Sequence, residues 1–353
     1  MKLYDNPLYM EDVDRTAALP LPWAKLAGKT ILLSGATGLV GSFLTDVLMR
    51  KNELGMGCRV YALSRSEERA RARFSRWSED PRLRFIPYDI NMPLVGESIE
   101  KADYILHLAS NTHPLQYSTD PIGTITTNII GLQNMLEFAV SRGAERVAFA
   151  SSNEVYGENR GDVEFFDETY CGYIDSNTLR AGYPESKRCG EALCQAYIRQ
   201  KGLDIVIPRL TRSYGPTMLM SDTKAISQFI RKAVSGEDIV LKSQGTQYYS
   251  YTYVSDAVSG LLTVLLCGKK GEAYNISDAS GDIMLRDLAA AIAGAAKKEV
   301  RFELPDEVEK AGYSTATKAR LDGSKLKKLG WRPFYDIRGG IGRTITILKD
   351  TAE

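Results

Sequence analysis

The 353-residue sequence is poor in the residues that build disulfide frameworks and metal sites. It has five scattered cysteines without a Cys-x-x-Cys pair and only two histidines, His107 and His113. An odd number of isolated cysteines is typical of reduced thiols, and two histidines are too few for a histidine-based metal centre. His107 stands in an apolar run, so we expect it to have a structural role. We therefore predict neither disulfides nor a bound metal.

The sequence also lacks an excess of charge and any long hydrophobic run. Its 45 Lys and Arg residues balance 44 Asp and Glu residues, which leaves no overall field to attract nucleic acid or an anionic membrane. The apolar run at 261–267 is too short to span a bilayer, and no apolar stretch near the N-terminus resembles a signal peptide. We expect a cytoplasmic protein that binds neither nucleic acid nor membrane.

Strand and helix patterns alternate along the first 210 residues of the chain. Amphipathic stretches such as residues 132–140 separate short apolar runs, which are typical of buried strands. The predicted strands lie at 30–34, 59–63, 83–86, 104–109, 146–150 and 203–207. This alternation predicts an α/β fold with a doubly wound parallel sheet.

A glycine-rich turn follows the first predicted strand and precedes a helical pattern. Its three glycines let the backbone bend sharply and approach a pyrophosphate, whose charge is met by the free N–H groups at the helix start. Because the strand and the helix flank the turn correctly, a dinucleotide site is favoured over an ordinary tight turn. The predicted cofactor contacts in this turn are Gly35, Thr37, Gly38, Leu39, Val40 and Gly41.

Tyr183 and Lys187 lie one turn apart at the start of a predicted helix, where Pro184 suits a first-turn position. A lysine ammonium near a phenol favours the phenolate, so we expect the pKa of Tyr183 to fall toward the working pH. Tyr183 would then act as a general base. Ser152 follows the strand at 146–150, and ligands bind at the carboxyl ends of parallel strands. We therefore predict that Ser152 and Tyr183 share a pocket.

These motifs, in this order, resemble the extended short-chain dehydrogenase/reductases, the superfamily of NAD(P)-dependent nucleotide-sugar epimerases, dehydratases and decarboxylases. Besides the motifs above, the similarity includes Asp89-Ile90, His107-Leu108-Ala109, Asn128, Arg209, Tyr214-Gly215-Pro216, Tyr253-Val254-Ser255-Asp256 and Arg320-x-Asp322. The resemblance implies a nucleotide-sugar substrate and a homodimer formed through the helices near 132–140 and 183–200. It implies further cofactor contacts at Ser64, Arg65, Asp89, Ile90, Leu108, Ala109, Ser110, Asn128, Tyr183 and Lys187.

The resemblance also implies a division of the chain. Residues 28–210, with parts of 245–280, are predicted to form an NAD(P)-binding Rossmann domain. Residues 211–353 are predicted to form mainly a smaller C-terminal substrate-binding lobe, because glycine and proline interrupt the regular pattern there. Residues 1–27 lie outside the resemblance and are predicted to be an N-terminal arm that packs on the surface or on a second subunit.

Glu154 separates the reactions that this superfamily catalyses. Dehydratases and UDP-glucuronate decarboxylases carry a glutamate at this position, whereas simple 4-epimerases usually lack an acid there. Glu154 is therefore implied to be a base or an electrostatic group beside the sugar, the alternative being a carboxylate turned toward solvent or a backbone cap. Asn153 replaces the aspartic acid with which dTDP-glucose 4,6-dehydratases protonate the leaving hydroxyl, so that mechanism is disfavoured.

Residues 108–131 and 214–230 resemble UDP-glucuronate decarboxylase most closely. Two departures concern charge: Tyr249 stands in place of that family's catalytic arginine, and Arg212-Ser213 replaces an asparagine. Arg212 is expected to hold the sugar-nucleotide diphosphate from a new direction. The substrate-binding positions implied here are Asn111, Tyr117, Asn153, Arg212, Ser213 and Tyr249.

The end of the second predicted strand bears on the cofactor. NAD enzymes of this fold normally place an acid there, but this chain has Ser64 and Arg65. A serine and an arginine suit a 2′-phosphate, with Arg69 as a second cation, so NADP is slightly favoured over NAD. The alternative is that Arg65 stacks over adenine while NAD binds.

We predict an enzyme that oxidises its sugar transiently at C4. Tyr183 takes the 4-hydroxyl proton, Ser152 hydrogen-bonds the reacting oxygen, Lys187 holds the ribose, and Glu154 acts near C5. A lyase, either a decarboxylase or a dehydratase, is the first interpretation, and a nucleotide-sugar epimerase, of the 4- or the 3,5-type, is the alternative. A non-catalytic NADP-sensing protein is a third, disfavoured by the intact Tyr183 and Lys187.

Overall fold

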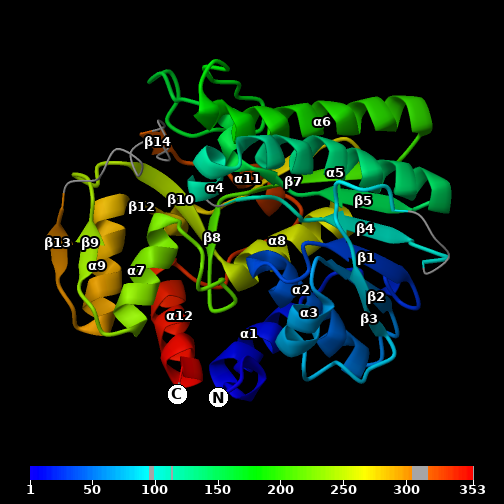
Figure 1. Cartoon of the computed structure of the whole chain (residues 1–353), viewed down its shortest axis with the longest axis horizontal. Coiled ribbons are helices and arrows are strands. Elements are labelled where there is room, and N and C mark those ends of the chain that lie inside the picture. The colour runs from blue at the N-terminus through cyan, green and yellow to red at the C-terminus, as the bar shows by residue number, and fades with distance from the viewer. Residues whose placement is uncertain (95–98, 113, 304–316, 353) are drawn as a thin grey trace.

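The apolar runs of the first half of the chain become strands of one parallel sheet (Figure 1). The computed structural model describes residues 1–94, 99–112, 114–303 and 317–352, so His113 and residues 304–316 and 353 of the predicted lobe lie outside the described residues. In spatial order the strands are β3 (Leu83–Pro87), β2 (Arg59–Ser64), β1 (Thr30–Ser34), β4 (Tyr104–His107), β5 (Arg146–Phe149), β7 (Ile205–Leu210) and β11 (Ala273–Ile276). A short strand, β6 (Ser151–Ser152), pairs with β7. The predicted α/β doubly wound parallel Rossmann sheet is confirmed.

The strand predicted at 203–207 lies further along the chain than expected. It begins at Ile205, because a left-handed Gly202 ends the preceding helix, and it continues to Leu210. The extension has a tertiary cause: β7 pairs with β5 on one side, and with β11 and β6 near its end. Strand β11 was not predicted, because the pattern around it is short.

Helices cover both faces of this sheet (Figure 1). One face carries α4 (Pro114–Thr119), α5 (Pro121–Arg142) and α6 (Gly182–Lys201); the other carries α2 (Leu39–Glu53), α3 (Glu67–Arg73) and α8 (Val254–Cys267). Local sequence sets the ends of α5, because the Asp120 side chain accepts a hydrogen bond from Gly123 N–H and Gly143 adopts a left-handed conformation after the last turn. None of the described helices is long and apolar enough to cross a membrane.

A second layer of short strands lies beside the main sheet. Strand β10 (Tyr248–Tyr253) pairs with β8 (Arg212–Tyr214), β12 (Asp282–Met284) and β14 (Lys318–Ala319), while β9 (Ile239–Leu241) pairs with β13 (Val300–Phe302). The described helices of this part are α7 (Ala225–Val234), α9 (Leu285–Ala296), α11 (Ser324–Lys327) and α12 (Ile337–Ala352). The predicted domain boundaries stay a prediction, although β11 and α8 pack with the main sheet as the 245–280 assignment requires.

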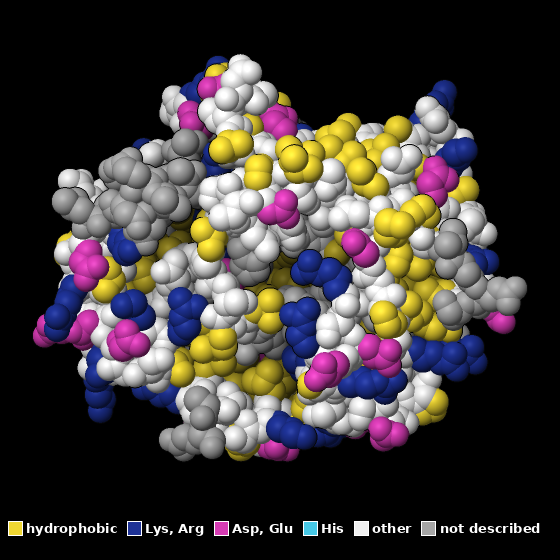
Figure 2. All heavy atoms as spheres, in the orientation of Figure 1, with side chains coloured by type: hydrophobic (Ala, Val, Ile, Leu, Met, Phe, Trp, Pro, Cys, Tyr) yellow, Lys and Arg dark blue, Asp and Glu magenta, His cyan; other side chains and the backbone are white. Residues whose placement is uncertain are grey.

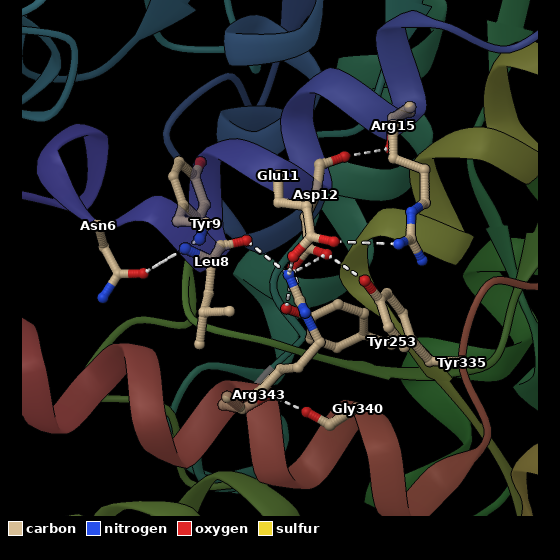
Figure 3. Close-up of polar contacts among 12 residues, drawn as sticks. Asn6, Leu8, Tyr9, Glu11, Asp12, Arg15, Tyr253, Tyr335, Gly340 and Arg343 are labelled. Carbon is tan, nitrogen blue, oxygen red and sulfur yellow. Dashed lines mark hydrogen bonds and ion pairs between the residues drawn. The ribbon is translucent and has the colours of Figure 1, made fainter.

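The segment predicted as an N-terminal arm packs into the body of the molecule. It forms two short 3-10 turns, Leu3–Asp5 and Trp23–Lys25, and helix α1 (Pro7–Ala17), which packs on α2, α8 and α12. Asp12 of α1 is fully buried and accepts hydrogen bonds from the hydroxyls of Tyr253 (2.6 Å) and Tyr335 (2.7 Å). Arg343 of α12 completes this cluster with an ion pair to Asp12 at 2.9 Å (Figure 3). Helix α1 therefore ties the nucleotide-binding side to the C-terminal helix.

Candidate functional site

The carboxyl ends of the parallel strands open onto a cavity of about 1200 Å³ between the main sheet and the second layer. Figure 2 shows a hollow in the middle of this face with Lys and Arg side chains beside it. Every predicted site residue except Asn128 lines the cavity: Gly35, Thr37, Gly38, Leu39, Val40, Gly41, Ser64, Arg65, Asp89, Ile90, Leu108, Ala109, Ser110, Asn111, Tyr117, Ser152, Asn153, Glu154, Tyr183, Lys187, Arg212, Ser213 and Tyr249. The fold thus brings these residues together.

The glycine turn has the tight backbone that a dinucleotide site needs, because side chains at Gly35 and Gly41 would collide with neighbouring backbone atoms. Gly35 has a φ of +71°, and a Cβ there would lie 2.7 Å from the backbone nitrogen of Ala109. A Cβ at Gly41 would lie 2.1 Å from the carbonyl oxygen of Gly35. Gly38 precedes α2 without a capping side chain, so the first N–H groups of the helix stay free for an anionic ligand.

Basic side chains lie where the second strand ends. Arg65 and Arg69 both line the cavity. Ser66 begins α3, because its side chain accepts a hydrogen bond from Arg69 N–H, and the hydroxyl of Ser64 donates to Ser66 O at 3.0 Å. The local turn therefore positions two guanidinium groups at this end of the cavity.

Asn128 does not line the cavity, unlike the other predicted cofactor contacts. It is fully buried on α5, where its Oδ1 accepts a hydrogen bond from the Ser110 hydroxyl (2.7 Å) and its Nδ2 donates to Ser186 Oγ (2.9 Å). Ser110 itself lines the cavity. Asn128 thus supports a cavity residue from behind.

Tyr183 lies at the start of α6 with its ring buried. Burial raises the pKa of its phenol to about 12; the carboxylate of Glu154 also raises the pKa, whereas hydrogen bonds from Ser152 and Ser110 lower it. The structure therefore places Ser152 with Tyr183, as predicted. The prediction that the pKa of Tyr183 falls toward the working pH is contradicted.

Burial of the phenol is the main cause of that difference, and Lys187 does not offset it. Its ammonium is buried, donates a hydrogen bond to Ala150 O at 2.9 Å, and lies 4.9 Å from the centre of the Phe149 ring but 5.9 Å from that of Tyr183. Burial lowers the pKa of Lys187 to about 7, so near neutral pH this side chain is only partly charged. The Tyr-x-x-x-Lys spacing alone could not indicate this loss of charge.

Glu154 forms an ion pair inside the site. Nη2 of Arg180 donates to both carboxylate oxygens, at 2.8 Å and 2.6 Å. Glu154 lies in a short 3-10 turn, Asn153–Tyr156, and Arg180 in another, Leu179–Ala181, just before α6. The side chain of Glu154 therefore neither turns to solvent nor caps the backbone. Sequence reasoning missed Arg180; its only signal was an arginine three residues before Tyr183.

Arg212 lies over the ring of Tyr249, the residue that stands in place of the catalytic arginine of the decarboxylases. The guanidinium carbon of Arg212 is 3.6 Å from the centre of the Tyr249 ring. The cause is the sheet register, because β8 and β10 pair with Arg212 opposite Tyr251, two residues from Tyr249. Nη1 of Arg212 is buried without a hydrogen-bond partner in the described part of the chain.

Nothing in the described part of the chain groups three or more His, Cys, Asp or Glu side chains in a way that could hold a metal ion. The polar side chains that meet in the cavity include Tyr183, Lys187, Ser152 and the Glu154–Arg180 ion pair, next to a turn that fits a dinucleotide.

Residues 31–277 match the model of the NAD dependent epimerase/dehydratase family. The chain belongs to this family. It is 34% identical over 314 residues to UDP-glucuronic acid decarboxylase 6 of Arabidopsis thaliana, covering 88% of this chain and 86% of that protein. The resemblance drawn from the motifs is thereby confirmed, and with it an enzyme of a family that uses a nicotinamide dinucleotide.

Solved structures agree with this placement. A dTDP-glucose 4,6-dehydratase from Streptomyces venezuelae, solved with NAD, superposes with a TM-score of 0.75 at 26% identity and covers 91% of this chain and 97% of its own. A UDP-glucuronic acid 4-epimerase from Bacillus cereus, solved with its substrate and NAD, has a TM-score of 0.77 at 21% identity and covers 91% and 99%. The likeness to the epimerase concerns the fold alone.

Proposed function

We propose that this protein is a nucleotide-sugar lyase that removes carbon dioxide from UDP-glucuronate or a closely related sugar acid. The observation that carries the proposal is the meeting of Glu154, Ser152 and Tyr183 in one cavity with the glycine turn. The family membership and the decarboxylase relative, which matches over most of both chains, support it.

In the proposed reaction, a dinucleotide held at the glycine turn would supply reversible hydride chemistry at C4 of the sugar. Tyr183 is the proposed base for the proton of the 4-hydroxyl, which requires its phenol to ionise despite the raised pKa, and Ser152 hydrogen-bonds the oxygen as it becomes a carbonyl. The 4-keto group then stabilises negative charge at C5, so the C5 carboxylate leaves as carbon dioxide and its bonding pair stays as an enolate. A proton from solvent then adds at C5, and reduction at C4 with return of the Tyr183 proton to the 4-oxygen completes the cycle. Glu154 and Arg180 flank this step.

The position of Arg212 supports decarboxylation despite the loss of the family's arginine. The guanidinium of Arg212 lies over the Tyr249 ring and lines the cavity. A positive charge therefore remains close to Tyr249, the position at which decarboxylases carry their arginine. A planar guanidinium with an unpartnered Nη1 suits a carboxylate or a phosphate. We assign Arg212 to an anionic group of the substrate.

A 4-epimerase is the second candidate, because Tyr249 takes the place of an arginine that decarboxylases use. Incubation of the purified protein and cofactor with UDP-, dTDP-, GDP- and CDP-sugars, followed by mass spectrometry, separates the candidates. We expect loss of carbon dioxide from a UDP-linked sugar acid. Unchanged product mass with an altered sugar would establish the epimerase, and loss of water a dehydratase.

We also propose NADP as the preferred cofactor. The support is the pair of cavity-lining guanidinium groups of Arg65, just after β2, and Arg69, on α3. The dehydratase and the epimerase named above were solved with NAD, so this preference would distinguish the chain from them.

A homodimer formed through α5 and α6 is a further proposal. Exposed apolar side chains support it, since Ile122 on α5 is 75% exposed and Leu179, just before α6, is 67% exposed. Figure 2 shows hydrophobic side chains gathered over these two helices. Sedimentation analysis is expected to give a dimer that the substitution Ile122→Glu dissociates; a monomeric wild-type protein would contradict the proposal.

A cytoplasmic location likewise stays a proposal. The five cysteines support it, because all are free thiols, two of them, Cys171 and Cys189, on the surface. Cell fractionation with an antibody against the protein tests it.

A further inference from the structure

Four residues from four separate elements form one continuous contact path in the cavity. Arg180 holds Glu154 through Nη2, and its guanidinium carbon lies 4.8 Å from the centre of the Tyr117 ring. The Tyr117 ring in turn stacks on Tyr183, with ring centres 5.0 Å apart and planes inclined by 25°. Arg180 therefore contacts both the carboxylate and, through one ring, the predicted base.

The hydrogen bonding of Arg180 is incomplete. Nε and Nη1 are buried and have no hydrogen-bond partner in the described part of the chain, although the side chain is only 15% exposed. A buried guanidinium that serves only the fold normally has its donors satisfied. Arg180 is instead fixed by one carboxylate and one aromatic face, both of which line the cavity.

The ion pair also balances charge beside the phenol of Tyr183. The carboxylate of Glu154 raises the pKa of Tyr183, and the guanidinium of Arg180 lowers it. Among the described residues, further ionisable groups near the phenol include Tyr117 on α4 and Lys187 on α6. Lys187 is only partly charged near neutral pH, so Arg180 is the cation that offsets Glu154.

We propose that Arg180 is a positioning residue for the reaction: it orients Glu154 beside the sugar and offsets the negative charge of that carboxylate next to Tyr183. This inference rests on the proposed function and adds a residue to it. A merely structural arginine would influence folding but not the protonation of Tyr183.

The test is the pH dependence of substrate oxidation at C4, followed by rapid-mixing absorbance of the reduced nicotinamide. In Arg180→Gln the charge of Glu154 is no longer offset, so the midpoint of the rising limb is expected to move up by about one pH unit. At a fixed pH on that limb, oxidation is then about tenfold slower. In the double variant Arg180→Gln/Glu154→Gln both charges are gone, and the midpoint returns to within a few tenths of a unit of wild type.

Two control variants separate charge from folding. Arg180→Lys keeps the charge and is expected to keep the midpoint. Arg188→Gln removes a nearby guanidinium that hydrogen-bonds Val155 O but does not line the cavity, and its midpoint is expected to stay at the wild-type value. Thermal unfolding of each variant without ligand shows whether it is folded.

If Arg180→Gln fails to fold, Glu154→Gln provides the test. Its midpoint should move down, because the positive charge of Arg180 is then no longer offset by Glu154. A midpoint that moves in neither variant, while the wild-type enzyme oxidises its sugar, overturns the role of Arg180 alone. Failure of the wild-type protein to oxidise any nucleotide sugar of the panel overturns the proposed function and this role together.

Discussion

Two carboxylates of this molecule, the buried Asp12 and the half-buried Glu154, are each held by an arginine with two tyrosines nearby, yet their surroundings differ. Around Asp12 both tyrosines donate their hydroxyls to the carboxylate, and the carboxylate is closed off from solvent (Figure 3). Around Glu154 the tyrosines contribute ring faces, the arginine keeps unpartnered donors, and the pair borders a large cavity. A satisfied network stabilises the fold, whereas an incompletely satisfied one beside a cavity is available for chemistry.

We expect the largest effect, a loss of stability, from substitution of Asp12, which binds Tyr253, Tyr335 and Arg343. Asp12→Ala leaves Arg343 without its buried partner, so we expect the free energy of unfolding to fall by about 3–5 kcal/mol. Urea denaturation of the cofactor-free protein measures this. Asp14→Ala on the same helix removes a surface carboxylate that pairs with Arg50, and it should cost less than about 1 kcal/mol. An equal loss of unfolding free energy in Asp12→Ala and Asp14→Ala would show that the buried Asp12 contributes no more to stability than a surface carboxylate.

Substitution of the cavity residue Tyr183 should instead lower activity. Tyr183→Phe keeps the ring stacked on Tyr117 and removes only the hydroxyl, so turnover should fall at least ~100-fold while stability changes little. Steady-state kinetics and thermal unfolding, run side by side, measure both effects. Tyr197→Phe on the same helix, outside the cavity lining, is the control. Turnover of Tyr183→Phe near the wild-type rate would refute the assignment of the base.

Glu154→Gln sharpens the comparison within the cavity. The amide keeps the shape of the side chain but loses its charge and basicity, so product formation should fall about 10-fold or more while oxidation at C4 continues and reduced cofactor accumulates. Absorbance of the reduced cofactor, followed beside product mass, measures the two steps. Glu185→Gln, at a more exposed carboxylate of α6, is the control. Product formation at the wild-type rate in Glu154→Gln favours the epimerase.

The smallest effect is expected at the cofactor end of the cavity. Arg65→Ala should weaken NADP binding by about tenfold and leave NAD binding nearly unchanged, because only NADP offers a 2′-phosphate for a charge-assisted hydrogen bond. Titration calorimetry with each dinucleotide measures the difference. Arg71→Ala removes an exposed guanidinium of α3 that pairs with Glu67 and serves as the control. Equal weakening of both dinucleotides would show that Arg65 serves the adenine or the fold.

The sequence by itself determined the features that depend on neighbouring residues. Apolar runs such as 30–34 report burial of consecutive side chains, and the strand–glycine–helix order of 30–53 specifies the dinucleotide turn. The spacing of Tyr183 and Lys187 follows from helix geometry. These features were predictable, because hydrogen bonding and periodicity act within a few residues.

Only the tertiary structure decided which distant charges meet. The partners of Asp12 lie at Tyr253, Tyr335 and Arg343, and nothing in residues 1–27 indicates them. The Glu154–Arg180 pair spans 26 residues. The strand register that brings Arg212 over Tyr249 is likewise set by pairing of remote segments. The pKa of Tyr183 rises rather than falls for the same reason: burial is a property of the packed fold, and it outweighs the charge of a lysine one helical turn away.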